Sequence, residues 1–313
     1  MKAVIVEHRG DEGTFKDVPR PEPGEHEILV RVIAASVNPI DWKVRDRGEH
    51  TLPFVLGQDF AGVVSEPGAR VSKYREGERI FGIARTHGAF AEYTVASEDD
   101  PEEPIAKIPD DVGDADAASL PTAGLTALAA IEWLRVEKGT TLLVVGATGG
   151  VGTFALQIAR DRSARVIGVA GSTSEGLARE LGADEFVAYD KEDLAAAIKA
   201  AHPGGVDAVL DLVSSGDAIK SMADLMHADG RIVSTIGSAD VDWFAQRNIA
   251  AVNLVMAQTP QSSHAGLRTL LELLEQQRMR VIIVDERPLA EAAEALAESK
   301  RGSVNGKIVI TVD

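Results

Sequence analysis

A cluster of glycines between an apolar run and an amphipathic segment constrains this chain more than any other sequence feature. The run Thr141–Val145 predicts a buried strand, and Gly150–Asp161 predicts a helix. The turn between them carries Gly146, Gly149, Gly150 and Gly152. In a dinucleotide site, such glycines permit the tight turn, the approach of the pyrophosphate and the packing of the helix on the strand. The pattern favours a phosphate bound at the helix N-terminus over a tight turn without a ligand.

The rest of the second half alternates β-favourable and helical runs. Strands are predicted at Arg165–Ala170, Glu185–Ala188, Asp207–Leu212, Arg231–Thr235 and Ala251–Met256. Helices are predicted at Ser174–Leu181, Glu192–Ala200 and Ser215–Met226. Alternation at this spacing produces right-handed βαβ units. We therefore expect an α/β fold with a doubly wound parallel sheet.

The first third and the tail have a different character. Short strands separated by turn residues are predicted at Lys2–His8, Glu27–Ala35, Ala61–Glu66, Arg79–Ile83 and Ala91–Ala96. In the tail, helices are predicted at His264–Gln276 and Leu289–Ser299, and strands at Val281–Val284 and Lys307–Val312. A chain of 313 residues is long enough for two domains. We place a β-rich domain at 1–121, a nucleotide-binding domain at 122–258, and a return of the tail to the first domain at 259–313.

Charge and cysteine content exclude several classes of function. The chain has 49 acidic and 32 basic residues, a net charge of −17, which repels nucleic acid and anionic membrane surfaces. It has no cysteine, which excludes disulfides, thiolate nucleophiles and Cys-based zinc sites. Thr140–Ala159 carries no charge and has the length of a membrane span, but its glycines fit a strand, turn and helix better. We find no targeting signal and expect a cytoplasmic location.

The end of the second predicted strand bears on the choice of cofactor. Sites for NAD usually place an acidic residue there, whereas this strand runs into Gly171 and then Ser172, Thr173 and Ser174. Their hydroxyls could donate to a 2′-phosphate, cap the following helix, or do both. No basic residue lies in this loop, so a cation must come from elsewhere, with Arg301 as one candidate. We therefore expect NADPH to be preferred modestly over NADH.

Seven motifs in the same order resemble the medium-chain dehydrogenase/reductase superfamily, in its zinc-independent quinone oxidoreductase branch. They are Asn38–Lys43 with Arg45 and Gly48, Gly57–Val64, Gly77–Gly82, Gly88–Tyr93, Ala118–Ala127, Gly182–Asp184 and Gly306–Val309. The resemblance covers nearly the whole chain. It implies a GroES-like β-rich catalytic domain, a Rossmann domain and a tail that returns to the first.

The resemblance also bears on metal binding. Zinc-dependent relatives have ligands at two positions that correspond here to Asn38 and Gln58. Amide side chains are poor zinc ligands, so we expect no metal site. Without a Lewis acid, reduction of quinones or conjugated enones is favoured, because the substrate itself delocalises the charge of the incoming hydride.

Residue roles follow from the same resemblance. Asn38 is expected near the nicotinamide and the substrate carbonyl, and Thr126 at the nicotinamide ribose or carboxamide. Ser174 stands where many relatives have a phosphate-binding Lys. The other expected cofactor contacts are Gly149, Gly150 and Val151 at the pyrophosphate, Tyr189 beside the adenosine phosphate, and the loops with Val213, Ser214, Ile236 and Gly237 along the cleft.

Two side chains of the first motif, Lys43 and Asp41, have more than one possible role. Lys43 could polarise a carbonyl or donate a proton, or be a solvated side chain on a short surface helix. Asp41 is interpreted as a residue that starts the helix or pairs with Arg45 rather than as a base. Asp59 is expected to hold local structure.

The leading hypothesis is an NADPH-dependent reductase of a quinone or an α,β-unsaturated carbonyl compound, with the proton from solvent or Lys43. The alternatives are a metal-free alcohol or aldehyde reductase, for which no well-placed acid stands out, and a cofactor-binding protein without turnover. The partner is a small-molecule substrate. A homodimer is expected through the edge strand Ala251–Met256.

Overall fold

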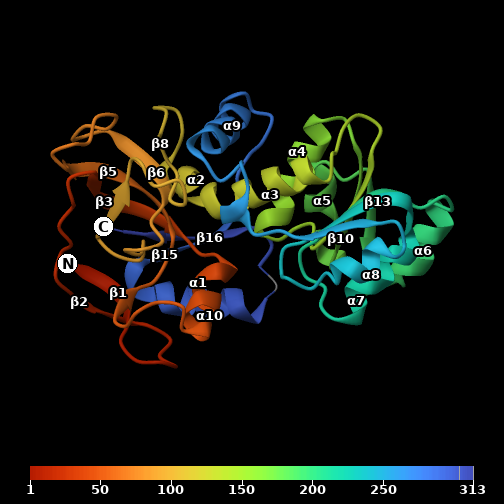
Figure 1. The fold of residues 1–313 in the computed structure, drawn as a ribbon, viewed down its shortest axis with the longest axis horizontal. Coiled ribbons are helices and arrows are strands. Elements are labelled where there is room, and N and C mark those ends of the chain that lie inside the picture. The colour runs from red at the N-terminus through yellow and green to blue at the C-terminus, as the bar shows by residue number, and fades with distance from the viewer. Residues whose placement is uncertain (303, 313) are drawn as a thin grey trace. The chain divides into compact units, whose positions relative to one another are not determined.

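The computed structural model describes residues 1–302 and 304–312 and divides into two compact units (Figure 1). The second unit comprises Thr126–Thr259 with Arg278–Arg280, and the first comprises the remaining segments. The division falls within helix α3 (Pro121–Trp133). The domain boundaries at 121 and 258 stay predictions.

A six-stranded parallel sheet forms the centre of the second unit. Its strand order is β11-β10-β9-β12-β13-β14, which confirms the predicted doubly wound sheet. The strands are β9 (Thr141–Val145), β10 (Arg165–Ala170), β11 (Glu185–Ala188), β12 (Val206–Asp211), β13 (Met226–Ser234) and β14 (Ala250–Asn253). The central strands are apolar and buried, as strands covered by helices on both faces must be.

Helices cover both faces of this sheet (Figure 1). One side carries α4 and α5, which pack on each other, and the other carries the three that follow. Their bounds are α4 (Gly150–Asp161), α5 (Glu175–Leu181), α6 (Leu194–Ala201), α7 (Asp217–Lys220) and α8 (Val241–Ala245).

Two predicted elements of this unit differ from the structure. The helix predicted at Ser215–Met226 is confirmed only in part. Residues Asp217–Lys220 form α7 and Ser221–Leu225 a 3₁₀ helix, whereas Met226 already pairs with Val206 in the sheet. The last strand is shorter than predicted, since β14 ends at Asn253 and Met256 begins another 3₁₀ turn.

The first unit is built on β-sheets. A seven-stranded sheet has the order β15-β16-β3-β5-β6-β8, with β7 also paired to β3, and a three-stranded sheet has the order β2-β1-β4. The strands are β1 (Lys2–Val6), β2 (Thr14–Asp17), β3 (Glu27–Ser36), β4 (Phe54–Val55), β5 (Asp59–Pro67), β6 (Arg79–Ile83), β7 (Tyr93–Ser97), β8 (Ile105–Lys107), β15 (Ile283–Pro288) and β16 (Lys307–Thr311). The helices are α1 (Pro39–Arg47), α2 (Asp114–Ser119), α9 (His264–Glu275) and α10 (Ala292–Arg301).

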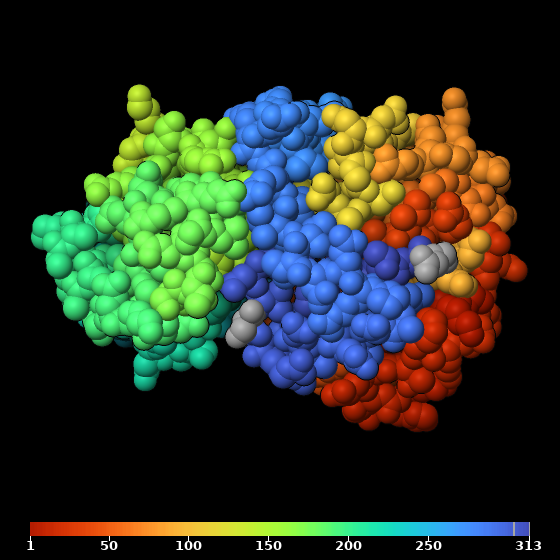
Figure 2. Space-filling model, turned by 180° about the vertical axis from the view of Figure 1, so that it is seen from behind, coloured from red at the N-terminus to blue at the C-terminus, as the bar shows by residue number. Residues whose placement is uncertain are grey.

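The two ends of the chain meet in the first unit. Strand β16 lies antiparallel to β3, with Ile310 opposite Ala35. Helix α10 packs on α1, where the Lys300 Nζ lies 2.7 Å from an Asp46 carboxylate oxygen. Figure 2 shows the late segments against the early ones on one surface. This pairing carries a residue near the C-terminus into the site at the end of β3.

Candidate functional site

The glycine turn after β9 leaves its outer side open. Gly146 has a φ of +89°, and the amides of Gly146 and Ala147 both donate to the Val169 carbonyl at 3.0 Å. A Cβ at Gly152 would lie 2.2 Å from the Gly146 carbonyl oxygen, so no side chain fits there. A Cβ at Gly149 would meet only that same oxygen, at 3.5 Å. The turn therefore packs closely on the helix side and leaves room at Gly149 for a phosphate at the start of α4.

The predicted cofactor residues of the second unit, apart from Thr126, lie in loops at the carboxyl ends of its strands. Because the strands are parallel, the loops after β9 to β13 all leave from their carboxyl ends. The Asp211 carboxylate accepts from the amides of Val213 and Ser214 at 3.0 and 2.7 Å. The Ser238 hydroxyl donates to the Ser214 carbonyl at 2.7 Å, which ties the loops after β12 and β13 together. This edge fits an extended dinucleotide; the individual contacts stay predictions.

The tip of β10 differs from expectation, because a carboxylate lies there. Asp190, in the loop after β11, accepts from the Ser172 amide at 2.7 Å and from the Ser172 hydroxyl at 2.8 Å. These bonds, the side-chain one first, hold the pKa of Asp190 below its usual range. Ser174 is only 5% exposed, whereas Tyr189 is 67% exposed. The expectation that no acid lies at this tip is therefore wrong, since a neighbouring strand supplies one.

In the first unit, Asn38 links two buried charges. It follows β3, and its side-chain amide donates to Asp59 at 2.8 Å and to the Ser36 carbonyl at 3.3 Å. Its Oδ1 accepts from the Lys307 Nζ at 2.6 Å. Asn38, Asp59 and Lys307 are at most 2% exposed. Both ends of the Asn38 amide are therefore engaged within the protein.

Burial alters the acidity of these charges. It raises the pKa of Asp59, against the opposing effects of Lys307 and of hydrogen bonds from Thr122 and Asn38. It lowers the pKa of Lys307, which the Asp59 charge partly offsets. Asp59 also accepts from the Thr122 hydroxyl at 2.6 Å, which confirms its expected structural role.

Sequence reasoning missed Lys307, although it appeared within a motif. A lysine at the start of the apolar strand Lys307–Thr311 is a signal for a buried charge. Its partner could not be found from spacing, because Asn38 lies 269 residues earlier.

Asp41 lies in the first turn of helix α1 and bonds its N-cap residue, which agrees with its predicted place at the helix start; it is a buried acid. Its Oδ2 accepts from the Asn38 backbone amide at 2.8 Å, while its Oδ1 is buried without a hydrogen-bond partner in the described residues. Burial raises the pKa of Asp41 to about 8, opposed chiefly by the bond from Asn38. The predicted pair with Arg45 is wrong, because Arg45 pairs with Asp46 at 2.8 Å.

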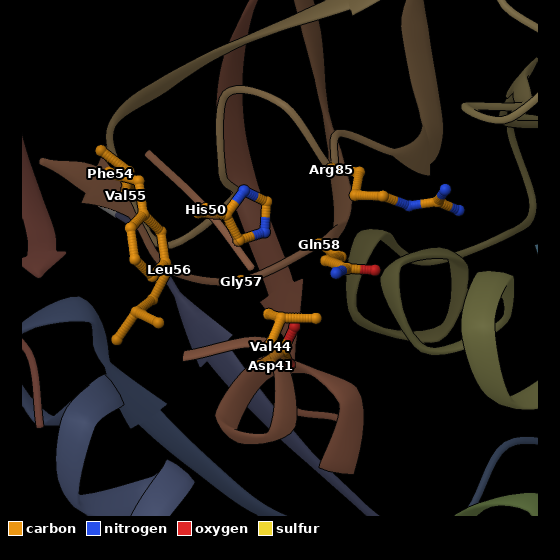
Figure 3. Close-up of a pocket in the computed structure, with 9 residues that line it drawn as sticks. All are labelled: Asp41, Val44, His50, Phe54, Val55, Leu56, Gly57, Gln58 and Arg85. Carbon is orange, nitrogen blue, oxygen red and sulfur yellow. The ribbon is translucent and has the colours of Figure 1, made fainter. Parts of the chain in front are cut away.

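A pocket opens beside this cluster (Figure 3). Gln58 is only 6% exposed, and its side chain has no hydrogen-bond partner within the described part of the chain, so its amide is available to a ligand. The His50 ring stacks on Phe54 with centroids 4.7 Å apart. The lining residues are Asp41, Val44, His50, Phe54, Val55, Leu56, Gly57, Gln58 and Arg85.

Lys43 lies on α1 but does not line this pocket. It is half-buried, and its Nζ lies 5.6 Å from the centre of the Trp42 ring. Burial, and then the charge of Arg47, lower the pKa of Lys43. Its role as a proton donor stays a prediction.

Residues 1–302 and 304–312 contain no group of three or more His, Cys, Asp or Glu side chains that could hold a metal ion. None of the helices in these residues is long and apolar enough to cross a membrane.

Comparisons with known proteins identify the family. Residues 24–110 match the alcohol dehydrogenase GroES-like domain, and residues 181–310 match the zinc-binding dehydrogenase family. The chain is 30% identical to the chloroplast envelope quinone oxidoreductase homolog of Arabidopsis thaliana, over 94% of this chain and 92% of the relative. It is 31% identical to a chloroplastic quinone-oxidoreductase of Triphysaria versicolor, with the same coverage.

Solved structures agree with this result. The quinone oxidoreductase from Coxiella burnetii is 34% identical with a TM-score of 0.90, over 100% of this chain and 99% of that one. A mycobacterial protein solved in complex with NADPH is 25% identical with a TM-score of 0.88, over 99% of each chain. The chain therefore belongs to the medium-chain dehydrogenase/reductase superfamily, in its quinone oxidoreductase branch.

Proposed function

We propose that this chain is an NADPH-dependent oxidoreductase that reduces quinones or α,β-unsaturated carbonyl compounds without zinc. Membership of the quinone oxidoreductase branch supports the reaction. One observation supports the absence of zinc most directly: the Asn38 Oδ1 already accepts from the buried Lys307 ammonium at 2.6 Å. A metal ion at Asn38 would have to displace that bond and lie beside a like charge.

The pocket of the first unit offers a conjugated carbonyl compound apolar contact and one donor. Phe54 and Val55 are partly exposed beside it, and the unengaged amide of Gln58 can donate to a carbonyl oxygen. NADPH, when bound, supplies a hydride from C4 of its nicotinamide. In this proposal Asn38 is a positioning residue beside the substrate end, because its own amide is held by Lys307 and Asp59.

The proton that completes the reduction has two candidate donors in this proposal. Asp41 lines the pocket and, with a pKa raised to about 8 by burial, holds a proton at neutral pH. That proton would pass to the oxygen or α-carbon of the reduced substrate, and the carboxylate would regain one from water. Lys43 is the other candidate. Asp41 is the acid that sequence reasoning did not find, and it would also serve the reduction of aldehydes.

The second unit carries the proposed cofactor contacts. The open backbone at Gly149 to Val151 fits the pyrophosphate, and the loops after β10 to β13 fit the rest of a dinucleotide. Thr126 is proposed at the nicotinamide end. A homodimer through β14 is proposed because this strand ends the sheet order and pairs only with β13 in the described residues; size-exclusion chromatography with light scattering would test it.

A panel of acceptors tests the proposed activity. NADPH oxidation is measured with quinones, enones and aldehydes, with and without a chelator, and zinc is determined by elemental analysis. We expect turnover of quinones or enones that the chelator leaves unchanged, and less than about 0.1 zinc per chain. Turnover of aldehydes alone would favour the alcohol and aldehyde reductase, and binding of NADPH with no turnover would favour the binding protein. One zinc per chain, lost together with activity, would contradict the mechanism.

A further inference from the structure

At the tip of β10, the hydrogen-bond donors of Ser172 are taken by a carboxylate of the protein itself. The one hydroxyl hydrogen of Ser172 is donated to Asp190, and the second oxygen of the same carboxylate takes the Ser172 amide. Both Ser172 donors that could meet a cofactor phosphate are therefore already engaged. The Asp190 side chain is 39% exposed, so it also faces solvent at this loop.

Charge at this position works against a 2′-phosphate. Such a group carries nearly two negative charges at neutral pH. If it approached Ser172, it would compete with a carboxylate that lies within 2.8 Å of that residue. A ribose 2′-hydroxyl has the opposite requirement, because it can donate to a carboxylate. The local charge is reduced by Lys191, whose Nζ lies 3.9 Å from Asp190.

The geometry points to Asp190 as a specificity-determining residue of the cofactor site: it accepts from the 2′-hydroxyl of NADH and opposes the 2′-phosphate of NADPH. The chain consequently binds NADH nearly as well as NADPH. Lys191 is the cation that keeps NADPH acceptable. This inference rests on the proposed function only in requiring that a nicotinamide dinucleotide binds along this edge.

Binding measurements on the full chain test the role of Asp190. Dissociation constants for NADPH and NADH are measured by isothermal titration calorimetry without substrate. In the wild type we expect the two constants to agree within about tenfold. Asp190→Asn keeps an oxygen for the Ser172 amide and removes the charge. It should tighten NADPH about tenfold and weaken NADH about threefold.

Two further variants make the test specific. Glu192→Gln removes the same charge two residues away, from an exposed side chain that does not bond Ser172, and should leave both constants unchanged. Lys191→Met should weaken NADPH about threefold or more and leave NADH unchanged. It keeps the test valid if Asp190→Asn fails to fold. In each variant, the affinity for 2′-AMP should change in the same direction as that for NADPH, and the affinity for 5′-AMP in the same direction as that for NADH.

The outcomes separate this inference from the proposed function. Equal changes for both cofactors in Asp190→Asn, or none, would overturn the specificity role and leave the proposed function intact. A wild-type preference for NADPH above about a hundredfold would do the same. A folded wild type that binds neither nucleotide would overturn both.

Discussion

Asp41 is a carboxyl group that the fold forces toward its neutral form. Because its folded pKa, about 8, lies above its ordinary 3.8, the native state binds more protons than the unfolded state between these values. Its contribution to stability is therefore complete below about pH 4 and is lost as pH rises through 8. We predict that Asp41→Asn gains stability relative to wild type from pH 5 to pH 8, by at most about 1.4 kcal/mol per pH unit. Urea denaturation at pH 5, 6.5 and 8 measures this difference.

Asp46 provides the matched control for that measurement. It lies on the same helix, with a side chain that is 35% exposed. Partial burial opposes the shift, but hydrogen bonds from Lys300 and Arg45 together lower the pKa of Asp46. A depressed pKa adds stability that is lost only as pH falls below the ordinary value. The difference between Asp46→Asn and wild type should therefore stay constant from pH 5 to pH 8. Parallel curves for both variants would contradict the assigned acidity of Asp41.

Lys307 is the second residue whose loss should be costly. Lys307→Met leaves the Asn38 Oδ1 without its donor and Asp59 without its nearest compensating charge. We predict a loss of about 3 kcal/mol or more in the free energy of unfolding, since an uncompensated buried charge is strongly unfavourable. Adding Asp59→Asn should restore part of this loss. An additive double-mutant cycle would show that the two charges do not interact.

At the scale of elements, the glycines of the turn after β9 are predicted to have separate roles: Gly152 in packing and Gly149 in cofactor binding. We predict that Gly152→Ala destabilises the second unit, because its Cβ would lie 2.2 Å from the Gly146 carbonyl oxygen. Gly149→Asp should fold normally but lose NADPH binding, because it adds bulk and negative charge where the pyrophosphate lies. Thermal denaturation and a nucleotide titration measure the two effects. A folded Gly149→Asp variant with unchanged affinity would show that the turn is only structural.

Sequence patterns predicted elements well where the pattern is local. The apolar runs of β9 and β10 and the glycines before α4 recur in the structure at the predicted residues. The helix expected after Ser215 ends before Met226, because Met226 pairs in the sheet with Val206, and tertiary pairing overrides helical propensity. Asp190 and Lys307 escaped prediction for a related reason. Each reaches its partner through the pairing of two strands: Asp190 follows the strand after that of Ser172, 18 residues on, and Lys307 lies 269 residues from Asn38.

At the scale of the whole molecule, acidic groups outnumber basic ones by 49 to 32. Many of the basic side chains are already used in exposed ion pairs, which contribute little each, so a surplus of carboxylates repels itself across the surface. Salt screens charges that lie far apart more than it screens the two charges of an ion pair, so it weakens the repulsion more than the pairing. The chain should therefore be more stable at high ionic strength than at low.

We predict that raising NaCl from about 0.05 to 1 M increases the Tm by roughly 2–4 °C, equivalent to about 1 kcal/mol. The triple variant Glu22→Gln, Asp111→Asn, Glu137→Gln reduces the net charge from −17 to −14. Its three positions are exposed and form no ion pair in the part of the chain that the structure describes. If repulsion causes the effect, the variant should start from a higher Tm and gain less from salt. Equal gains in both proteins would assign the effect to the exclusion of salt from the protein surface.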